Sequence, residues 1–318
     1  MEFEPRESQL RYLLCIDFDN TLFLTSSPSS NDITVERAYE LALDKIFGFG
    51  GSDMVGFLGL QDQTPTGFVS RLLKKGRDHY IGRARDIYEK SLEGKSVKYL
   101  PECPDGIIQW DEENPERTLV QLLVEHKLQF LIPEIGLKDE NNQIWPPPCN
   151  GVPEFLEIVK QLKKQGYPID LAVISSGHHS FIQRTFDMHG FDQPDILITE
   201  DSVRNRRYPE ENERRFKPGL FPLALAHQEW LHKQGLCLSK DDVLGDIKRS
   251  KERMVFIDDN HDAAVAAVLK GKVESRIYPD TSWESVTKSL IENKNLLQGG
   301  RPISEILPPL PGLIPAEI

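Results

Sequence analysis

Long apolar runs, an excess of basic residues and a secretion signal are all missing from this sequence of 318 residues. No stretch approaches the roughly 18 apolar residues that a membrane-spanning helix needs. The opening MEFEPRESQL lacks the basic start and apolar core of a signal peptide. The 38 lysines and arginines are outnumbered by 50 aspartates and glutamates, for a formal net charge of -12, whereas nucleic-acid binding depends on a basic surface. We therefore expect a cytoplasmic protein that binds neither membranes nor nucleic acid.

Cysteine is also scarce, and its distribution excludes two further classes of protein. The four cysteines show no C-x-x-C spacing, so the sequence contains no pattern for a thiolate metal site or a disulfide framework. What the chain does have is 39% hydrophobic residues, enough for a packed core. Its length exceeds the roughly 100 to 200 residues of one domain, so we expect two domains or one core with an insertion.

A short apolar run near the N-terminus ends abruptly in acidic residues. Residues 12–16 are too few for a helix and are typical of a strand buried on both faces. Asp17, Asp19 and Thr21 follow at the end of that strand, where ligands bind in open α/β sheets. Two carboxylates so close together repel each other, and a hard cation such as Mg²⁺ would offset the repulsion. The alternative is an Asx-type turn, because D-x-D-N-T is rich in turn-forming residues.

A second apolar stretch, residues 169–174, ends in Ser175, Ser176 and Gly177. Hydroxyl groups and backbone N–H groups at the start of a helix can hold a phosphate group. The same three residues also suit an ordinary turn from a strand to a helix.

Lys217 stands directly before Pro218, a residue suited to the first turn of a helix. A lysine at that point can direct a compact positive charge at a phosphoryl oxygen and at a carboxylate. The alternatives are a solvated surface lysine, or the same role taken by Arg214 or Arg215.

A fourth segment, MVFIDDNHDAAVAA, repeats the pattern of an apolar strand followed by acids. Asp258 and Asp259 lie at the strand end and would add to the repulsion in the first segment unless a metal or a raised pKa compensated for it. Asp258, Asp259 and Asp262 are candidate metal ligands in this segment, and Asn260 is a further contributor.

Strands and helices alternate from about residue 150 onward, which predicts a doubly wound parallel α/β sheet. The predicted core comprises residues 1–22 and 150–297, and a mostly helical domain, residues 23–149, is inserted after the first strand. Three consecutive prolines in DENNQIWPPPCN mark a hinge near the end of the insertion. Residues 298–318 form a proline-rich tail, a frayed arm or a segment that docks a protein partner. The predicted helices begin near Val35 and cover 66–75, 80–92, 115–128, 152–164, 178–189, 218–233, 261–269 and 282–293.

Taken in order, the four segments resemble the motifs of the haloacid dehalogenase (HAD) superfamily. The resemblance implies that Asp17 is the nucleophile, Asp19 the general acid and base, and the insertion a C1-type helical cap. It also implies a Mg²⁺ ion and a phosphate-binding set. The implied metal ligands are Asp17, the Asp19 backbone carbonyl and Asp259, which alignment on the alanine pair favours over the alternates Asp258 and Asp262. The implied phosphate-binding residues are Thr21, Ser175, Ser176 and Lys217.

The resemblance implies a hydrolase: a Mg²⁺-dependent phosphatase that acts on a small phosphorylated metabolite through an aspartyl-phosphate intermediate. The alternatives are a phosphomutase, a phosphotyrosine or other protein phosphatase, and a HAD-fold protein that mainly binds a partner. A cluster of basic residues in the cap is a candidate for substrate contacts, with a solvated helix end as the alternative. That cluster comprises Arg71, Lys74, Lys75, Arg77 and His79.

Overall fold

The computed structural model describes residues 11–48, 65–94, 110–204, 217, 219–236, 247, 251–268, 273–278 and 280–307. The chain divides into two compact units. Unit 1 comprises Met1–Leu24, Pro148–His179 and His189–Ile318, and unit 2 comprises Thr25–Pro147 and Ser180–Met188. The segment Ser180–Met188 lies in a helix that the sequence analysis assigned to the core, although its contacts place it in unit 2.

Unit 1 is built on a five-stranded parallel sheet with the order β3-β2-β1-β4-β5. The first strand of the chain is the central strand, so it is covered on both faces, and all five of its residues are buried. This burial explains its unbroken apolar sequence. The predicted doubly wound parallel sheet is confirmed. The strands are β1 (Tyr12–Ile16), β2 (Ile169–Ile174), β3 (Ile196–Ile198), β4 (Met254–Asp258) and β5 (Glu274–Ile277).

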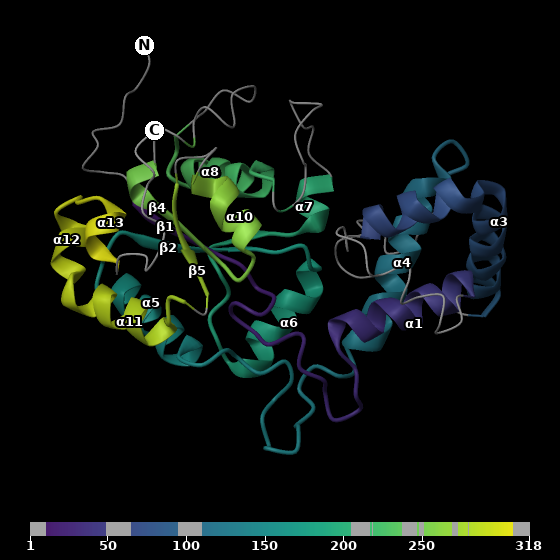
Figure 1. The fold of residues 1–318 in the computed structure, drawn as a ribbon, viewed down its shortest axis with the longest axis horizontal. Coiled ribbons are helices and arrows are strands. Elements are labelled where there is room, and N and C mark those ends of the chain that lie inside the picture. Colours follow the sequence, from purple (N-terminus) through teal and green to yellow (C-terminus); the bar gives the residue numbers. More distant parts are fainter. Residues whose placement is uncertain are drawn as a thin grey trace, which may run out of the picture. The chain divides into compact units, whose positions relative to one another are not determined.

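Helices cover both faces of this sheet. On one face, α8 (Phe221–Lys233) contacts β1, β2 and β3, and α10 (His261–Ala266) contacts β4 and β5. On the other face, α5 (Val152–Lys164) packs against β2 and against α11 (Trp283–Glu292) (Figure 1). Right-handed crossovers between parallel strands place helices on both sides in this way.

The remaining helices of the chain's second half are short, apart from α6. Within the described residues of that half, they are α6 (His179–His189), α7 (Glu200–Arg204), η2 (Lys251–Arg253), α12 (Lys294–Gln298) and α13 (Ile303–Ile306). Three predicted helices begin or end three residues away from the predicted position: the helix predicted at 115–128 continues to Leu131, α8 starts at Phe221 and α10 ends at Ala266.

Part of the predicted C-terminal tail belongs to the fold of unit 1. Helix α13 lies within it, and Ile303 and Ile306 are buried. The Tyr12 hydroxyl donates a hydrogen bond to the Arg301 carbonyl at 2.6 Å. Residues 298–307 are therefore packed, because their apolar side chains fall at a spacing that one helical turn can bury. The rest of the predicted tail, residues 308–318, lies outside the described residues.

Unit 2 is mostly helical, and its helices share an apolar core. Helix α1 (Val35–Phe47) is capped by Thr34, whose side chain accepts a hydrogen bond from the Arg37 N–H. Helix α4 (Pro115–Leu131) packs against α1. Helix α3 (Pro65–Gly94) joins the two helices predicted at 66–75 and 80–92. Its backbone departs from helical geometry at Gly76, which marks the predicted break as a kink.

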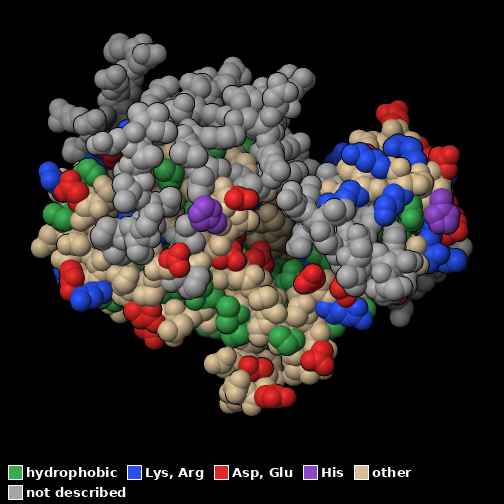
Figure 2. All heavy atoms as spheres, viewed as in Figure 1, with side chains coloured by type: hydrophobic (Ala, Val, Ile, Leu, Met, Phe, Trp, Pro, Cys, Tyr) green, Lys and Arg blue, Asp and Glu red, His purple; other side chains and the backbone are tan. Residues whose placement is uncertain are grey.

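The basic cluster predicted in the cap lies on both sides of this kink in α3. Lys74, Lys75, Arg77 and His79 are exposed. Basic and acidic side chains share the visible surface of unit 2 (Figure 2). The role of this cluster in substrate binding stays a prediction. Among the described residues, the structure contains no helix long and apolar enough to cross a membrane.

Candidate active site

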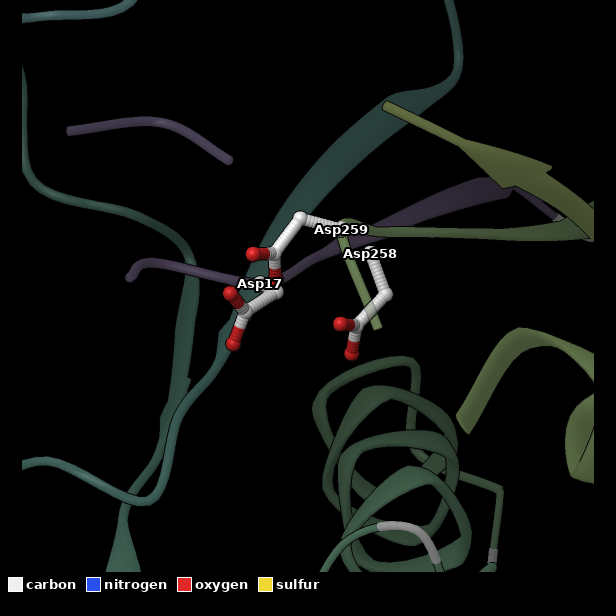
Figure 3. Close-up of side chains that lie close together, drawn as sticks. All are labelled: Asp17, Asp258 and Asp259. Carbon is white, nitrogen blue, oxygen red and sulfur yellow. The ribbon is translucent and has the colours of Figure 1, made fainter. Parts of the chain in front are cut away.

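Three carboxylates lie close together at the carboxyl ends of the neighbouring strands β1 and β4. Asp17 follows β1, Asp258 is the last residue of β4, and Asp259 comes next. Ile16 pairs with Ile257 in the parallel register, so the residues after them come side by side. Each of the three aspartates offers an oxygen atom within 4.8 Å of the others (Figure 3). Segments about 240 positions apart in the sequence therefore form one acidic cluster.

Lys217 places one positive charge against two carboxylates of this cluster. Its Nζ atom contacts the Asp17 carboxylate and lies 2.9 Å from Asp258 Oδ2. The side chains of Asp17 and Asp258 are 3% and 1% exposed, and that of Lys217 is 14% exposed. The predicted lysine is thus held in an ion-paired, nearly water-free position between two acids.

Thr21 joins the first and fourth motifs through its hydroxyl group. Its Oγ1 donates to Asp17 Oδ2 at 3.2 Å and accepts from the Asp259 backbone N–H at 2.9 Å. The residue is fully buried. In this geometry the hydroxyl positions two carboxylates relative to each other, in addition to the phosphate contact that the resemblance implies for it.

Asp19 and Ser175 form a second, neighbouring pair. Ser175 Oγ donates to Asp19 Oδ2 at 2.9 Å and accepts from the Gly177 backbone N–H at 2.8 Å. Strands β1 and β2 are neighbours in the sheet, which places the residues after them at the same edge. Asp19 is not a member of the three-carboxylate cluster. Ser176 is half-buried next to this pair.

The structure distinguishes the candidate metal ligands of the fourth motif. Both oxygens of Asp258 accept hydrogen bonds, from Lys217 and from the Asn260 backbone N–H at 2.8 Å. The Asn260 side-chain oxygen caps α10 by accepting from Asp262 N–H and Ala263 N–H. Asp262 is exposed and lies outside the cluster, whereas Asp259 belongs to it and is exposed to solvent. Of the two neighbouring acids, this arrangement favours Asp259 over Asp258 as the fourth-motif carboxylate available to a cation.

Burial and repulsion by neighbouring carboxylates raise the pKa values of Asp17 and Asp259. For Asp17, burial raises the pKa, the charge of Lys217 opposes the rise, and Asp258 and Asp19 add to it. For Asp259, burial and the neighbouring Asp258 raise the pKa to about 6. Burial by itself would lower the pKa of Lys217, but the charges of Asp17 and Asp258 outweigh burial and raise it.

The donor set suits a hard divalent cation. All three side chains are carboxylates, the ligand type that Mg²⁺ takes in proteins. At metal–oxygen distances of about 2.1 Å, oxygens on opposite sides of an octahedral ion are about 4.2 Å apart. Ligand oxygens already within 4.8 Å of one another therefore need only small shifts to surround such an ion. With one lysine against three acids, the cluster also has an excess of negative charge for a cation to neutralise.

Trp283 and Cys149, which lie outside the motifs, donate hydrogen bonds to the loop that follows β1. The Trp283 indole Nε1–H donates to the Thr21 carbonyl at 2.9 Å. The Cys149 thiol donates to the Asn20 carbonyl at 3.5 Å, and the Cys149 N–H donates to the Leu22 carbonyl at 2.9 Å. The sequence analysis did not identify either residue as part of the site, because no spacing in the sequence links them to the first motif.

Comparison with known proteins gives matches among solved structures at low sequence identity. No protein-family model and no curated protein matches the chain. CbbY from Rhodobacter sphaeroides, solved in complex with phosphate, is 12% identical over 85% of this chain and 87% of that chain, with a TM-score of 0.44. L-2-haloacid dehalogenase from Xanthobacter autotrophicus, with chloropropionic acid covalently bound, is 13% identical over 92% and 89%, with a TM-score of 0.35.

The HAD-hydrolase YfnB from Bacillus subtilis, bound to magnesium, is 12% identical over 86% of this chain and 91% of that chain, with a TM-score of 0.37. At this level of similarity, the chemistry has to be argued from the site itself.

Proposed function

We propose that this chain is a Mg²⁺-dependent phosphatase of the HAD type that hydrolyses a phosphate monoester of a small metabolite. The observation that carries the proposal is the meeting of Asp17, Asp258 and Asp259 around Lys217 at one edge of the sheet. A nucleophilic carboxylate, a cation site and a fixed positive charge are the parts that phosphoryl transfer to a carboxylate requires.

Asp17 acts as the nucleophile in the first half of the reaction. One of its oxygens forms a bond to phosphorus while the bond from phosphorus to the substrate oxygen breaks, leaving an aspartyl-phosphate. Asp19 donates a proton to the departing oxygen, which leaves as an alcohol. The hydrogen bond from Ser175 to Asp19 Oδ2 at 2.9 Å holds the Asp19 carboxyl group in place for this transfer.

In the second half, Asp19 takes a proton from a water molecule, and the water oxygen attacks the phosphorus. The bond between phosphorus and Asp17 breaks, which restores the carboxylate and releases inorganic phosphate. Lys217, paired with Asp17 throughout, stabilises the negative charge on the phosphoryl oxygens. The hydroxyl of Thr21 keeps the attacking carboxylate oriented by its 3.2 Å hydrogen bond.

Asp17 and Asp259 would hold the Mg²⁺ ion, with the Asp19 backbone carbonyl as a third ligand and Asp258 supporting the cluster through Lys217. When bound, the ion supplies charge neutralisation between the anionic substrate and the anionic nucleophile. The chain's own residues supply orientation, proton transfer and the lysine charge.

The test is hydrolysis of p-nitrophenyl phosphate with Mg²⁺, followed by a screen of phosphorylated metabolites. We expect Asp17→Asn to lower the rate at least about 10³-fold, because an amide cannot form the covalent intermediate. Asp192→Asn, which alters an exposed acid paired with Lys160, is the matched control and should retain the wild-type rate. Equal rates for wild type and Asp17→Asn would refute the assignment of the nucleophile.

A further inference from the structure

The loop that carries the nucleophile's supporting hydroxyl is a tight turn. Leu22 N–H and Phe23 N–H both donate to the Phe18 carbonyl, at 3.2 and 3.0 Å, and Asn20 N–H donates to the Phe23 carbonyl at 2.7 Å. Asn20 adopts the left-handed backbone conformation, with φ of 58°. The carbonyl groups of Asn20, Thr21 and Leu22 are left to find donors outside the turn.

Side chains and backbone from distant segments provide those donors. Trp283 supplies its indole N–H to the Thr21 carbonyl at 2.9 Å. Cys149 supplies its thiol to the Asn20 carbonyl and its backbone N–H to the Leu22 carbonyl. All three carbonyls of the turn are therefore satisfied from elsewhere in unit 1, at a site where Thr21 is fully buried and has no access to water.

Trp283 is itself held rigidly. It is the first residue of α11, which Ser282 caps, and only 1% of it is exposed. Its ring lies 4.5 Å from that of Phe155 on α5, between ring centroids, and 6.2 Å from that of Tyr278. The backbone of Gly151 approaches so closely that a Cβ atom there would lie 2.9 Å from Trp283 Cβ. The indole N–H therefore has little freedom to follow the loop if the loop moves.

We propose that Trp283 is a positioning residue for the nucleophile Asp17, an inference that rests on the proposed function. Its hydrogen bond fixes the Thr21 peptide, and the Thr21 hydroxyl in turn bridges Asp17 Oδ2 and the Asp259 N–H. One indole thus sets the relative placement of the attacking carboxylate and the cation-binding carboxylate. Small displacements of reacting groups are costly in rate, up to about 10²-fold for an ångström.

The experiment compares Trp283→Phe with Trp230→Phe. Phenylalanine keeps an aromatic ring in the core but removes the N–H donor and part of the indole's volume, and both of these losses are shared by the two variants. Trp230 is also 1% exposed, and its indole N–H donates to Asp170 Oδ2 at 3.0 Å. Asp170 lies near the start of β2, at the amino end of the strand and therefore away from the active site. Both variants lose one buried indole hydrogen bond, so the comparison separates positioning from general destabilisation.

We expect Trp283→Phe to lower kcat for p-nitrophenyl phosphate about 10-fold or more while KM changes less than about twofold, because the transition state is more sensitive to placement than substrate binding is. Trp230→Phe should keep the wild-type kcat. The second measurement is the hydrogen exchange rate of the Asp259 amide, which we expect to rise in Trp283→Phe relative to Trp230→Phe. The positioning role is overturned if both variants behave alike in kcat and in this exchange rate.

The exchange measurement needs no turnover, so it separates this inference from the proposed function. A wild-type protein inactive on all phosphate esters would refute the function while the Asp259 amide still reports the link to Trp283. If Trp283→Phe does not fold, Cys149→Ala and Cys149→Ser provide the second test, because serine keeps a donor for the Asn20 carbonyl. We expect alanine to lower kcat and serine to restore most of it; equal kcat values in the two variants would count against external positioning of this loop.

Discussion

Replacing Lys217 by methionine is the most direct test of the electrostatics of this site. Methionine has a similar length and no charge, so the substitution leaves Asp17 and Asp258 facing each other without their shared cation. Both acids are at most 3% exposed, so water cannot replace the lysine. Removing one partner of a buried ion pair costs about 3–5 kcal/mol. We expect the free energy of unfolding at pH 7.5, without metal, to fall by that amount.

The assay is urea unfolding of wild type and variant in EDTA, repeated with Mg²⁺. A cation bound by the carboxylates replaces part of the missing charge, and binding at 100 times the dissociation constant stabilises a folded protein by about 2.7 kcal/mol. The stability deficit of Lys217→Met should therefore shrink when Mg²⁺ is added. Phosphatase activity should remain low even then, because the fixed charge beside the phosphoryl group is gone.

The matched control is Lys160→Met, which removes an ion pair with Asp192 at 2.9 Å whose two side chains are 31% and 63% exposed. Exposed pairs contribute about 0–1 kcal/mol. If Lys217→Met loses no more stability than Lys160→Met in EDTA, then Lys217 is not the counter-charge of a buried acidic cluster, and our account of the site is wrong.

Three further predictions concern the metal ligand Asp259, the bridging hydroxyl of Thr21 and the buried imidazole of His227. Asp259→Asn should raise the Mg²⁺ concentration for half-maximal activity at least about 10-fold, since it removes a ligand; a change below twofold would contradict the metal assignment. Thr21→Val should lower kcat about 10- to 100-fold with KM nearly unchanged, and a wild-type kcat would show that the bridging hydroxyl is dispensable. His227 is fully buried, and burial lowers its pKa from 6.5 to about 4. Between these pH values the unfolded state binds one proton more than the folded state, so the free energy of unfolding falls as the pH drops through this range, by up to about 3 kcal/mol. His227→Phe should flatten that loss in urea unfolding measured from pH 7 to 4.5; an unchanged profile would mean that another group is responsible.

Local patterns in the sequence were sufficient to predict the strands and the chemistry at their ends. The run from Tyr12 to Ile16 is apolar without alternation because the central strand is covered on both faces. Ile169–Ile174 and the strand ending at Asp258 follow the same rule, and parallel strands bring their carboxyl ends to one edge. Knowing which segments are buried parallel strands was therefore enough to predict that the first and fourth motifs would meet.

Details that depend on side-chain hydrogen bonds could not be predicted in this way. Asp258 and Asp259 are adjacent in the sequence, but in the structure Asp258 is buried and its oxygens accept from Lys217 and the Asn260 N–H, whereas Asp259 is exposed. In the same way, Ser175 is turned toward Asp19 in the structure, a contact that bridges β1 and β2 and has no signature within either segment.

The sequence by itself determined the parallel sheet, the helical insertion and the residue types at the carboxyl ends of the strands. Local apolar patterns were sufficient for this, because they indicate which segments are buried strands and where those strands end. Only the tertiary structure decided how those ends are held. Trp283 and Cys149 lie 262 and 129 positions from the carbonyls that their side chains satisfy. A hydrogen bond to a backbone carbonyl depends on where two chain segments come to lie in space, and it places no constraint on the residue type at the carbonyl, so no local pattern can reveal it.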